Sequence, residues 1–230
     1  MKASSLLSLV LGIALIIVCG RNAFASKENQ NQKEKEQSWG NSTPHSSWGG
    51  EQKSNYPFIV QETVVMIGTY DAKGNPDVMM AVATQKGNQI TMHMSNHQTT
   101  ENFEKTGGFT LAFITEETVA ESDYFGTTSE KKVPGKVKHV GFTWHNASKV
   151  NAPVIDQYPL TLECKVASWK DGVLVADIIG SDIDKRIQDN DGKIDYDKLK
   201  PVVFDEGTHE YRTVGTAVGK VYGASMKFRR

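Results

Sequence analysis

The stretch that decides the fold covers residues 77–113, DVMMAVATQKGNQITMHMSNHQTTENFEKTGGFTLAF. It reads as a strand, a turn, a second strand, a polar loop, a short helix and a third strand, because runs of strand-forming residues alternate with turn-forming glycines. The polar loop and the expected start of the helix carry the polar side chains Ser95, His97, Gln98, Thr99 and Thr100. A helix start presents free backbone N–H groups and the positive end of the helix dipole, so this loop suits a phosphate.

The strand before this loop contains the small residues Ala81 and Ala83. Small side chains let another group approach the backbone closely, and the backbone of residues 80–83 could donate hydrogen bonds to a flat ring. An anion loop beside an apolar strand therefore predicts a site for flavin mononucleotide (FMN) rather than for a dinucleotide, and no G-x-G-x-x-G sequence follows a strand. Two simpler readings stay open: an ordinary capped helix start and a plain core strand. Trp144 or Tyr124 could flank the ring, or lie in the core.

Further strand patterns flank this stretch. They are expected at residues 63–70 and, as a hairpin around the Lys-Asp-Gly turn at 170–172, at residues 160–169 and 173–183. Helices are few: one at about residues 100–106, with Thr99 as its cap and Gly107 and Gly108 as its stop, and one at about residues 116–124. The pattern predicts a mainly antiparallel β domain, a barrel whose mouth is covered by helices.

The N-terminal region differs in composition from the rest. Lys2, an apolar run at residues 6–18 and an Ala-Phe-Ala sequence at 23–25 have the pattern of a secretory signal peptide covering residues 1–25. An acylated Cys19 or an uncleaved anchor are the alternatives, although the apolar run is short for a bilayer. Residues 26–56 are too poor in aliphatic side chains to bury a core, which predicts a disordered polar linker before a domain at 57–230.

Composition and motifs narrow the function classes. The chain has 26 basic and 27 acidic residues, so it lacks the positive field of a nucleic-acid-binding protein. The glycine-lysine run at 215–220 lacks the spacing and hydroxyl of a phosphate loop, and the loop at 189–194 lacks the last acid of a calcium site. No metal site is expected, since His139 and His145 lack nearby ligands. After signal cleavage Cys164 is the one remaining cysteine; we expect it to be buried, with a reactive thiol as the alternative.

From about residue 57 to residue 225, the chain resembles the flavin reductase-like, FMN-binding split-barrel family, close to the flavoredoxins. The matching segments occur in the family's order: DVMMAVAT at 77–84, SNHQTTENFEKTGGFTLAF at 95–113, FGTTSEKKVPGKVKHVGFTW at 125–144, SKVNAPVIDQYPLTLEC at 148–164 and the closing segment from residue 191. Departures are His97-Gln98, where the family often carries Arg or His with Lys, and Asp77, near the family's usual Asn.

The resemblance implies an antiparallel split β-barrel of the FMN-binding type with a few peripheral helices, FMN as cofactor, and a homodimer whose interface holds the flavin. The flavin-binding residues that it implies are Met79, Met80, Ala81, Val82, Ala83, Ser95, His97, Gln98, Thr99, Thr100 and Lys136. Lys131 and Lys132 leave the register of the phosphate-side lysine open.

The expected function is that of an exported FMN-dependent oxidoreductase that transfers hydride or electrons through bound flavin. No catalytic acid or base is evident, which fits chemistry carried by the cofactor. Free nicotinamide nucleotides are scarce outside the cytoplasm, so a redox protein or a quinol-linked donor would then supply the electrons. The alternatives are a non-enzymatic flavoredoxin-like electron carrier, and a split barrel that has lost flavin and binds another ligand or partner. No nucleic acid and no membrane span after signal cleavage are expected.

Overall fold

The computed structural model describes residues 61–221 and residue 224. The chain divides between Phe58 and Ile59, and the described elements all belong to the second unit. The predicted signal peptide at 1–25, the predicted linker at 26–56 and the first residues of the predicted domain lie outside the described residues, so they stay predictions.

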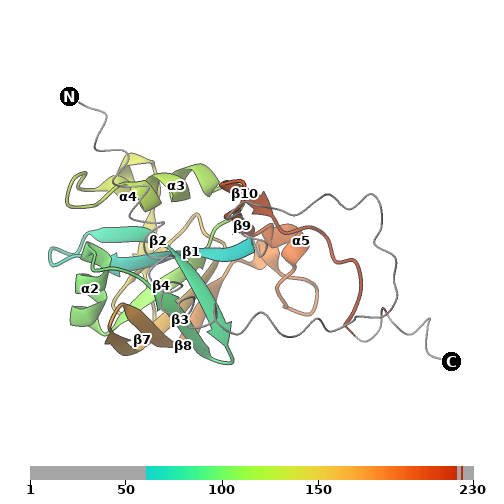
Figure 1. Ribbon diagram of the computed structural model, residues 1–230, viewed down its shortest axis with the longest axis horizontal. Coiled ribbons are helices and arrows are strands. Elements are labelled where there is room, and N and C mark those ends of the chain that lie inside the picture. The colour runs from blue at the N-terminus through green and yellow to red at the C-terminus, as the bar shows by residue number, and fades with distance from the viewer. Residues whose placement is uncertain (1–60, 222–223, 225–230) are drawn as a thin grey trace, which may run out of the picture. The chain divides into compact units, whose positions relative to one another are not determined.

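Six antiparallel strands close into a barrel (Figure 1). Their order around the barrel is β1 (Gln61–Tyr70), β2 (Pro76–Lys86), β3 (Gln89–His93), β8 (Val173–Ile183), β7 (Leu160–Lys170) and β4 (Gly108–Phe113). Strand β1 also pairs with β4, with Val65 opposite Phe113 and Ile67 opposite Leu111, and this pairing closes the ring. The predicted antiparallel split barrel is therefore confirmed, as are the strands expected in the segment that decides the fold.

The β7–β8 hairpin shows how the sequence sets the register. Its two turn residues, Asp171 and Gly172, have φ angles of 52° and 77°. Both central residues of a type I′ turn need positive φ, and Asp-Gly tolerates this better than most pairs. The strands on either side then pair from Lys170–Val173 to Leu160–Ile183, with irregularities at Glu163/Cys164 and Val166/Ser168.

Alternate residues of the six strands fill the barrel with one apolar cluster. Strand β2 contributes Met79, Ala81 and Ala83, and the other strands contribute residues such as Ile67 and Leu174. Helix α2 (Gln98–Thr106) adds Phe103, which is fully buried and meets Trp169 edge-on at 5.6 Å between ring centroids. Helix α2 therefore covers one end of the barrel, as the sequence predicts.

A second cluster lies on the outer side of β1, β2 and β4. It is covered by α3 (Val119–Thr127), α4 (Lys136–His139) and the hairpin of β5 (Trp144–Asn146) and β6 (Pro153–Ile155). Strands β9 (Val202–Asp205) and β10 (Glu210–Thr213) extend the sheet from β1. Only one of the two expected helices thus covers the barrel mouth; the other, α3, packs on the outer face of β2.

The helix bounds differ from the expected ones for local reasons. Helix α3 begins later than expected because the hydroxyl of Thr118 accepts the N–H of Thr115, which closes a turn at 115–118 before the helix. The 3₁₀ helix η1 (Lys185–Ile187) and α5 (Tyr196–Leu199), short elements after β8, were not foreseen. Within the part of the chain that the structure describes, no helix is long and apolar enough to cross a bilayer.

Candidate functional site

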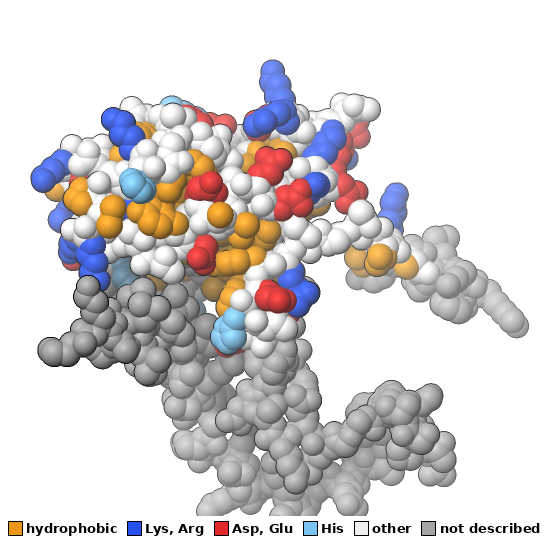
Figure 2. Space-filling view, turned by 90° about the horizontal axis from the view of Figure 1, so that it is seen from above, with side chains coloured by type: hydrophobic (Ala, Val, Ile, Leu, Met, Phe, Trp, Pro, Cys, Tyr) orange, Lys and Arg blue, Asp and Glu red, His pale blue; other side chains and the backbone are white. Residues whose placement is uncertain are grey.

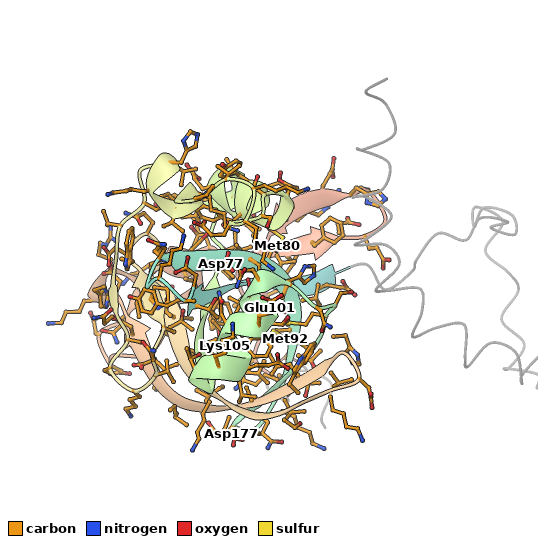
Figure 3. All side chains as sticks on the ribbon, turned by 90° about the vertical axis from the view of Figure 1, so that its left-hand side faces the viewer. Asp77, Met80, Met92, Glu101, Lys105 and Asp177 are labelled. Carbon is orange, nitrogen blue, oxygen red and sulfur yellow. The ribbon has the colours of Figure 1, made fainter. Side chains whose placement is uncertain are left out.

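Asp77 is the centre of a buried polar network where β2 begins. Its side chain is 2% exposed. One carboxylate oxygen, Oδ2, accepts the hydroxyl of Thr99 at 2.7 Å, and the other, Oδ1, lies 3.3 Å from the Nζ of Lys136. Asp77 therefore connects strand β2 to the first turn of helix α2 and to helix α4. Figure 3 shows Asp77 and Met80 on the strand above helix α2, which carries Glu101 and Lys105.

Lys136 is a buried cation rather than a surface one. Its side chain is 2% exposed, and its Nζ donates to the carbonyl of Thr128 at 2.8 Å in addition to facing Asp77. Burial lowers the pKa of the Lys136 ammonium, and the charge of Asp77 opposes this effect. A buried ion pair whose remaining donors are satisfied fixes geometry, and removing either partner is costly.

Asn102 extends the network to the neighbouring strand. Its Nδ2 donates to the hydroxyl of Thr69 on β1 at 3.0 Å and lies 3.5 Å from Oδ2 of Asp77. Its Oδ1 accepts the side-chain amide of Gln98 at 2.8 Å. The first turn of α2 is therefore fixed against two barrel strands by side chains that are mostly buried.

The start of α2 differs from the expected one and leaves backbone donors free. The helix is capped by His97, not Thr99, which lies buried inside the first turn. The hydroxyl of Thr100 accepts the N–H of His97 and donates to its carbonyl. The N–H groups of Gln98 and Thr99 have no acceptor among the described residues, as is usual for the first turn of a helix. Backbone amides rather than threonine hydroxyls are thus the available donors here.

The other loop residues face solvent. Ser95 and His97 are exposed, and Gln98 is half-buried. Loss of hydration lowers the pKa of the His97 imidazole, and the charge of Asp77 acts in the opposite direction. The exposed Ser95 hydroxyl and the His97 ring are therefore side-chain donors still free to meet an anion at this helix start.

The five implied residues of β2 are divided between the two faces of the strand. Met79, Ala81 and Ala83 pack inside the barrel, whereas Met80 and Val82 pack against the outer cluster. All five are only partly buried. Ala81 and Ala83 therefore place small side chains in the barrel interior. Met80 and Val82 are the residues that the strand presents on its outer face.

Figure 2 looks down on the side of the molecule that carries α3 and α4, and hydrophobic side chains remain visible there between charged ones. The partly buried residues of the outer cluster include Met80, Val82, Tyr124 and Trp144. The structure thus brings both aromatic residues that the sequence singled out to the same cluster as Met80. Gly126 of α3 lies so close to β2 that an added Cβ would be 3.1 Å from the Cβ of Met80.

The three lysines of the segment after α3 have different surroundings. Lys131 and Lys132 are exposed, and Nζ of Lys131 lies 3.2 Å from Oε1 of Glu101 in the first turn of α2. Lys136 is the lysine that turns inward, where Glu130 accepts its backbone N–H at 3.3 Å. The structure therefore places Lys131 at the surface near the start of α2 and commits Lys136 to Asp77.

The structure also shows the surroundings of Cys164 and of the side chains that could bind a metal ion. Cys164 is a buried free thiol inside the barrel, and burial raises its pKa to about 12. A thiol with so high a pKa is a poor nucleophile at neutral pH. Among residues 61–221 and 224, no group of three His, Cys, Asp or Glu side chains is placed to hold a metal ion.

A surface cleft of about 150 Å³ lies elsewhere, against the β5–β6 hairpin. It is lined by His145, Val154, Ile155, Asp156, Tyr158, Pro159, Asp182 and Asp184. None of the implied flavin-binding residues lines it. The start of α2 and the outer face of β2, on which α3 packs, thus lie outside this cleft.

Two residues of the network escaped the sequence analysis. Asn102 and Thr69 were read as ordinary helix and strand residues, although both are buried. A usable signal was present, because Asn102 lies four residues after Gln98 and one before the core residue Phe103, so it falls next to the buried face of the helix. Thr69 gave no such signal, since threonine is common in strands.

Comparisons with known proteins agree with this architecture. The flavoredoxin of Desulfovibrio vulgaris (Miyazaki F) superposes with a TM-score of 0.70 at 24% identity, covering 76% of this chain and 100% of that one. A flavoredoxin from Methanosarcina acetivorans gives 0.67 at 23% identity, covering 79% and 100%. An FMN-binding protein from Thermus thermophilus, solved with bound 1-cyclohex-2-enone, gives 0.59 at 12% identity, covering 77% and 99%. At these identities the likeness shows the fold.

A search of curated proteins by sequence found no match. The family comparison is decisive instead: the model of the flavin reductase like domain matches residues 59–197, which include the barrel strands β1–β4, β7 and β8 and the buried network around Asp77. The chain therefore belongs to the family of flavin reductase like domains.

Proposed function

We propose that this protein binds FMN and passes hydride or electrons through it, as an FMN-dependent oxidoreductase. The observation that carries the proposal is the placement of the free amides of α2 beside the start of β2, where Thr99 binds Asp77. Asp77, which holds the helix start, and Met80 are three residues apart on one strand, about 10 Å. A phosphate at the helix start and a ring at the strand are then joined by the ribityl chain of one FMN molecule.

The phosphate end of this site uses backbone donors and surface cations. The N–H groups of Gln98 and Thr99 are free, and the Ser95 hydroxyl is exposed beside them. The helix dipole favours an anion at this point. Because the charge of Lys136 is balanced by Asp77, the cations of this segment that remain for the phosphate are the exposed Lys132 and Lys131, whose present partner is the exposed Glu101.

The ring end uses the backbone and side chains of residues 79–83 on β2, with Trp144 or Tyr124 beside Met80 in the outer cluster. When bound, FMN would supply the hydride or electron chemistry. The chain's own residues position it: the Asp77–Lys136 pair and Thr99 hold the helix start and the strand at a fixed distance from each other.

A second copy of the chain completes the site in this proposal. Of the implied binding residues, Ser95 and His97 are exposed, residues 79–83 and Gln98 are partly buried, and Thr99, Thr100 and Lys136 are buried; none lines the cleft described above. Cofactor sites bury most of their ligand, so one open face needs a cover. A homodimer formed on the Met80 and Val82 face would provide it, with the apolar side chains of the outer cluster as the contact.

A non-enzymatic electron carrier is the second candidate function. Two observations favour it: the two flavoredoxins match this chain over their whole length, and the titratable residues at the buried start of α2 are paired with each other. A carrier needs no residue that moves a proton to a substrate. Steady-state oxidation of NADH or NADPH with added flavin separates the two candidates, because a carrier reacts only with its redox partners.

Export of the protein is also part of the proposal, on the pattern of residues 1–25. It is tested by the mass of the protein recovered from the growth medium or the periplasm of an expressing bacterium, which should correspond to cleavage after Ala25. Recovery of the uncleaved chain in the cytoplasm would contradict export without affecting the flavin proposal.

The flavin proposal is tested by an absorbance spectrum of the purified chain with and without added FMN, followed by anaerobic titration with a nicotinamide nucleotide. Bound FMN with its visible bands shifted supports the site. Reduction by the nucleotide supports the enzyme, and bound flavin without reduction supports the carrier. No binding supports a barrel that has lost its flavin.

A further inference from the structure

His145 bridges two carboxylates that belong to different parts of the fold. Its Nδ1 lies 2.7 Å from Oδ1 of Asp156, which follows strand β6, and its Nε2 lies 2.9 Å from Oδ2 of Asp182 on barrel strand β8. The imidazole comes from strand β5. The contact with Asp156 therefore links the two sides of the β5–β6 hairpin, and the contact with Asp182 links the hairpin to the barrel.

The protonation state follows from counting donors. A carboxylate only accepts hydrogen bonds, and a neutral imidazole carries one N–H. Both contacts can be hydrogen bonds at once only when the imidazole holds two protons and a positive charge. When His145 loses a proton, one ring nitrogen becomes an acceptor facing a carboxylate oxygen, and that contact turns repulsive.

The other charged groups that line the cleft beside His145 are carboxylates. The cleft around it is lined by Asp156, Asp182, Asp184 and the buried Tyr158. Asp184 is bound to Arg186, whose NH2 lies 2.7 Å from its Oδ2. Burial raises the pKa of the Tyr158 hydroxyl, so Tyr158 stays neutral near pH 7. His145 is thus the group in this cleft that changes charge near neutral pH.

The two ends of the hairpin are attached differently. Near its turn, Glu163 accepts the Ser148 hydroxyl at 2.7 Å and the backbone N–H of Lys149 at 2.5 Å, and Lys149 donates to the carbonyl of Ile179 at 2.9 Å. None of these contacts involves a histidine side chain. At the open end, beside Trp144, His145 makes a side-chain link with Asp182 on barrel strand β8. One residue further along β5, the Tyr70 hydroxyl of β1 donates to Oδ1 of Asn146 at 2.6 Å.

The geometry points to a pH-dependent clamp: protonated His145 fastens the open end of the β5–β6 hairpin to barrel strand β8, and loss of its proton releases that end. The direction of the pKa agrees. The hydrogen bond that the His145 ring makes to Asp156 raises the pKa of His145 above 6.5, the one to Asp182 also raises it, and desolvation lowers it. The clamp therefore contributes fully below pH 6.5, the unfolded value, and is lost as the pH rises through the higher folded value.

Release of the open end of the β5–β6 hairpin affects the outer cluster. Strand β5 carries Trp144, which packs against the same outer cluster as Met80 and Val82. Loosening this end at alkaline pH frees a large aromatic side chain next to the outer face of β2. The clamp itself is independent of any flavin, since none of its atoms belongs to the implied flavin site.

The test is a pH titration of the histidine ring signals by NMR, with the full chain and with Asp182→Asn. We expect the His145 signal, assigned with His145→Gln, to titrate with a midpoint above 6.5 and to move toward 6.5 in the variant. His93 is exposed on strand β3 and makes no ion pair among the described residues, so its ring signals should not differ between the two proteins and serve as the control.

Hydrogen exchange gives the structural readout. The N–H of Asp156 donates to the carbonyl of Thr143 at the open end, and that of Ala147 donates to Ala152 near the turn. After correction for intrinsic rates, exchange at Asp156 should accelerate as His145 deprotonates, whereas exchange at Ala147 should not. His145→Gln should exchange fast at Asp156 at every pH. A His145 midpoint at or below 6.5, or Asp156 exchange independent of pH in the unaltered chain, overturns the clamp.

Discussion

Asp77 shows how a single residue joins the parts of the proposed site. Its two oxygens receive Thr99 from α2 and Lys136 from α4, while Asn102 reaches the same carboxylate from the next turn of α2. A buried carboxylate is stable only with such partners. The negative charge of Asp77, which stands near the family's usual asparagine, is therefore balanced by the buried ammonium of Lys136.

The first prediction concerns this pair. Lys136→Met leaves the Asp77 carboxylate buried without a cation, so we expect the free energy of unfolding to fall by about 3–5 kcal/mol. Urea unfolding followed by circular dichroism measures it. Adding Asp77→Asn to the same protein removes the buried charge and should restore most of the loss, because an amide oxygen still accepts the Thr99 hydroxyl.

Lys131→Met is the matched control for that experiment. Its partner Glu101 is 48% exposed and Lys131 is 58% exposed. Exposed pairs contribute about 0.2–1 kcal/mol, so this variant should unfold close to the unaltered protein. Equal losses of unfolding free energy in Lys136→Met and Lys131→Met would show that the buried pair contributes no more to stability than the exposed pair.

The second prediction separates the two lysines in ligand binding. Removing Lys131 and Lys132 together, as alanines, should weaken FMN binding by about 2–5-fold and leave riboflavin binding unchanged, because only FMN carries the phosphate. Fluorescence titration at low salt measures both affinities, since salt screens exposed charges. An equal loss for riboflavin would place these lysines away from the phosphate.

At the scale of elements, helix α2 is defined by its two ends. Its C-terminal residue is followed by Gly107, whose φ of 74° is left-handed and whose N–H donates to the carbonyl of Phe103 at 2.8 Å. Gly107 therefore stops the helix directly before β4 begins, and this fixes the distance between the proposed anion site and the barrel.

The third prediction tests that stop. Gly107→Ala should lower the free energy of unfolding by about 1–2 kcal/mol, because an alanine Cβ is strained in the left-handed region. Gly107→Asn should cost less, since asparagine tolerates this conformation. Nothing lies within 4 Å of a Cβ built at Gly107, so a difference between the two variants reports backbone strain rather than a clash. Identical losses would refute this explanation.

The same elements show what the sequence could predict. The strand pairs joined by short turns and the end of α2 followed from local patterns, because turn and stop residues act within a few positions of one another. The start of α2 was displaced from Thr99 to His97 because Thr99 is drawn inward by Asp77, which is 22 residues away in sequence. A tertiary contact of this kind leaves no local signal.

At the scale of the whole molecule, the candidate site was predicted in part. The helix start and strand β2 are adjacent, as expected, but the split of Met79–Ala83 between two faces and the inward turn of Lys136 depend on how the barrel closes. Lys131, Lys132 and Lys136 look alike in sequence; their burial differs because only the last meets Asp77.

The fourth prediction concerns assembly. Light scattering of the purified chain with FMN should give the mass of two chains. Val82→Glu, which puts a charge on the outer face of β2, should reduce both dimer content and flavin binding. Gln85→Glu, at an exposed position on the opposite face of the same strand, is the control and should change neither. A monomer that binds one FMN per chain would refute the role of a second copy.

The most direct test of FMN binding at the start of α2 is an equilibrium titration of the apoprotein with FMN, followed by the visible absorbance of the flavin. We expect saturable binding of about one FMN per chain. Riboflavin should bind more weakly, because the free amides at the start of α2 meet the phosphate that only FMN carries. An unchanged flavin spectrum at saturating concentrations, from a chain whose circular dichroism shows an intact barrel, would contradict FMN binding.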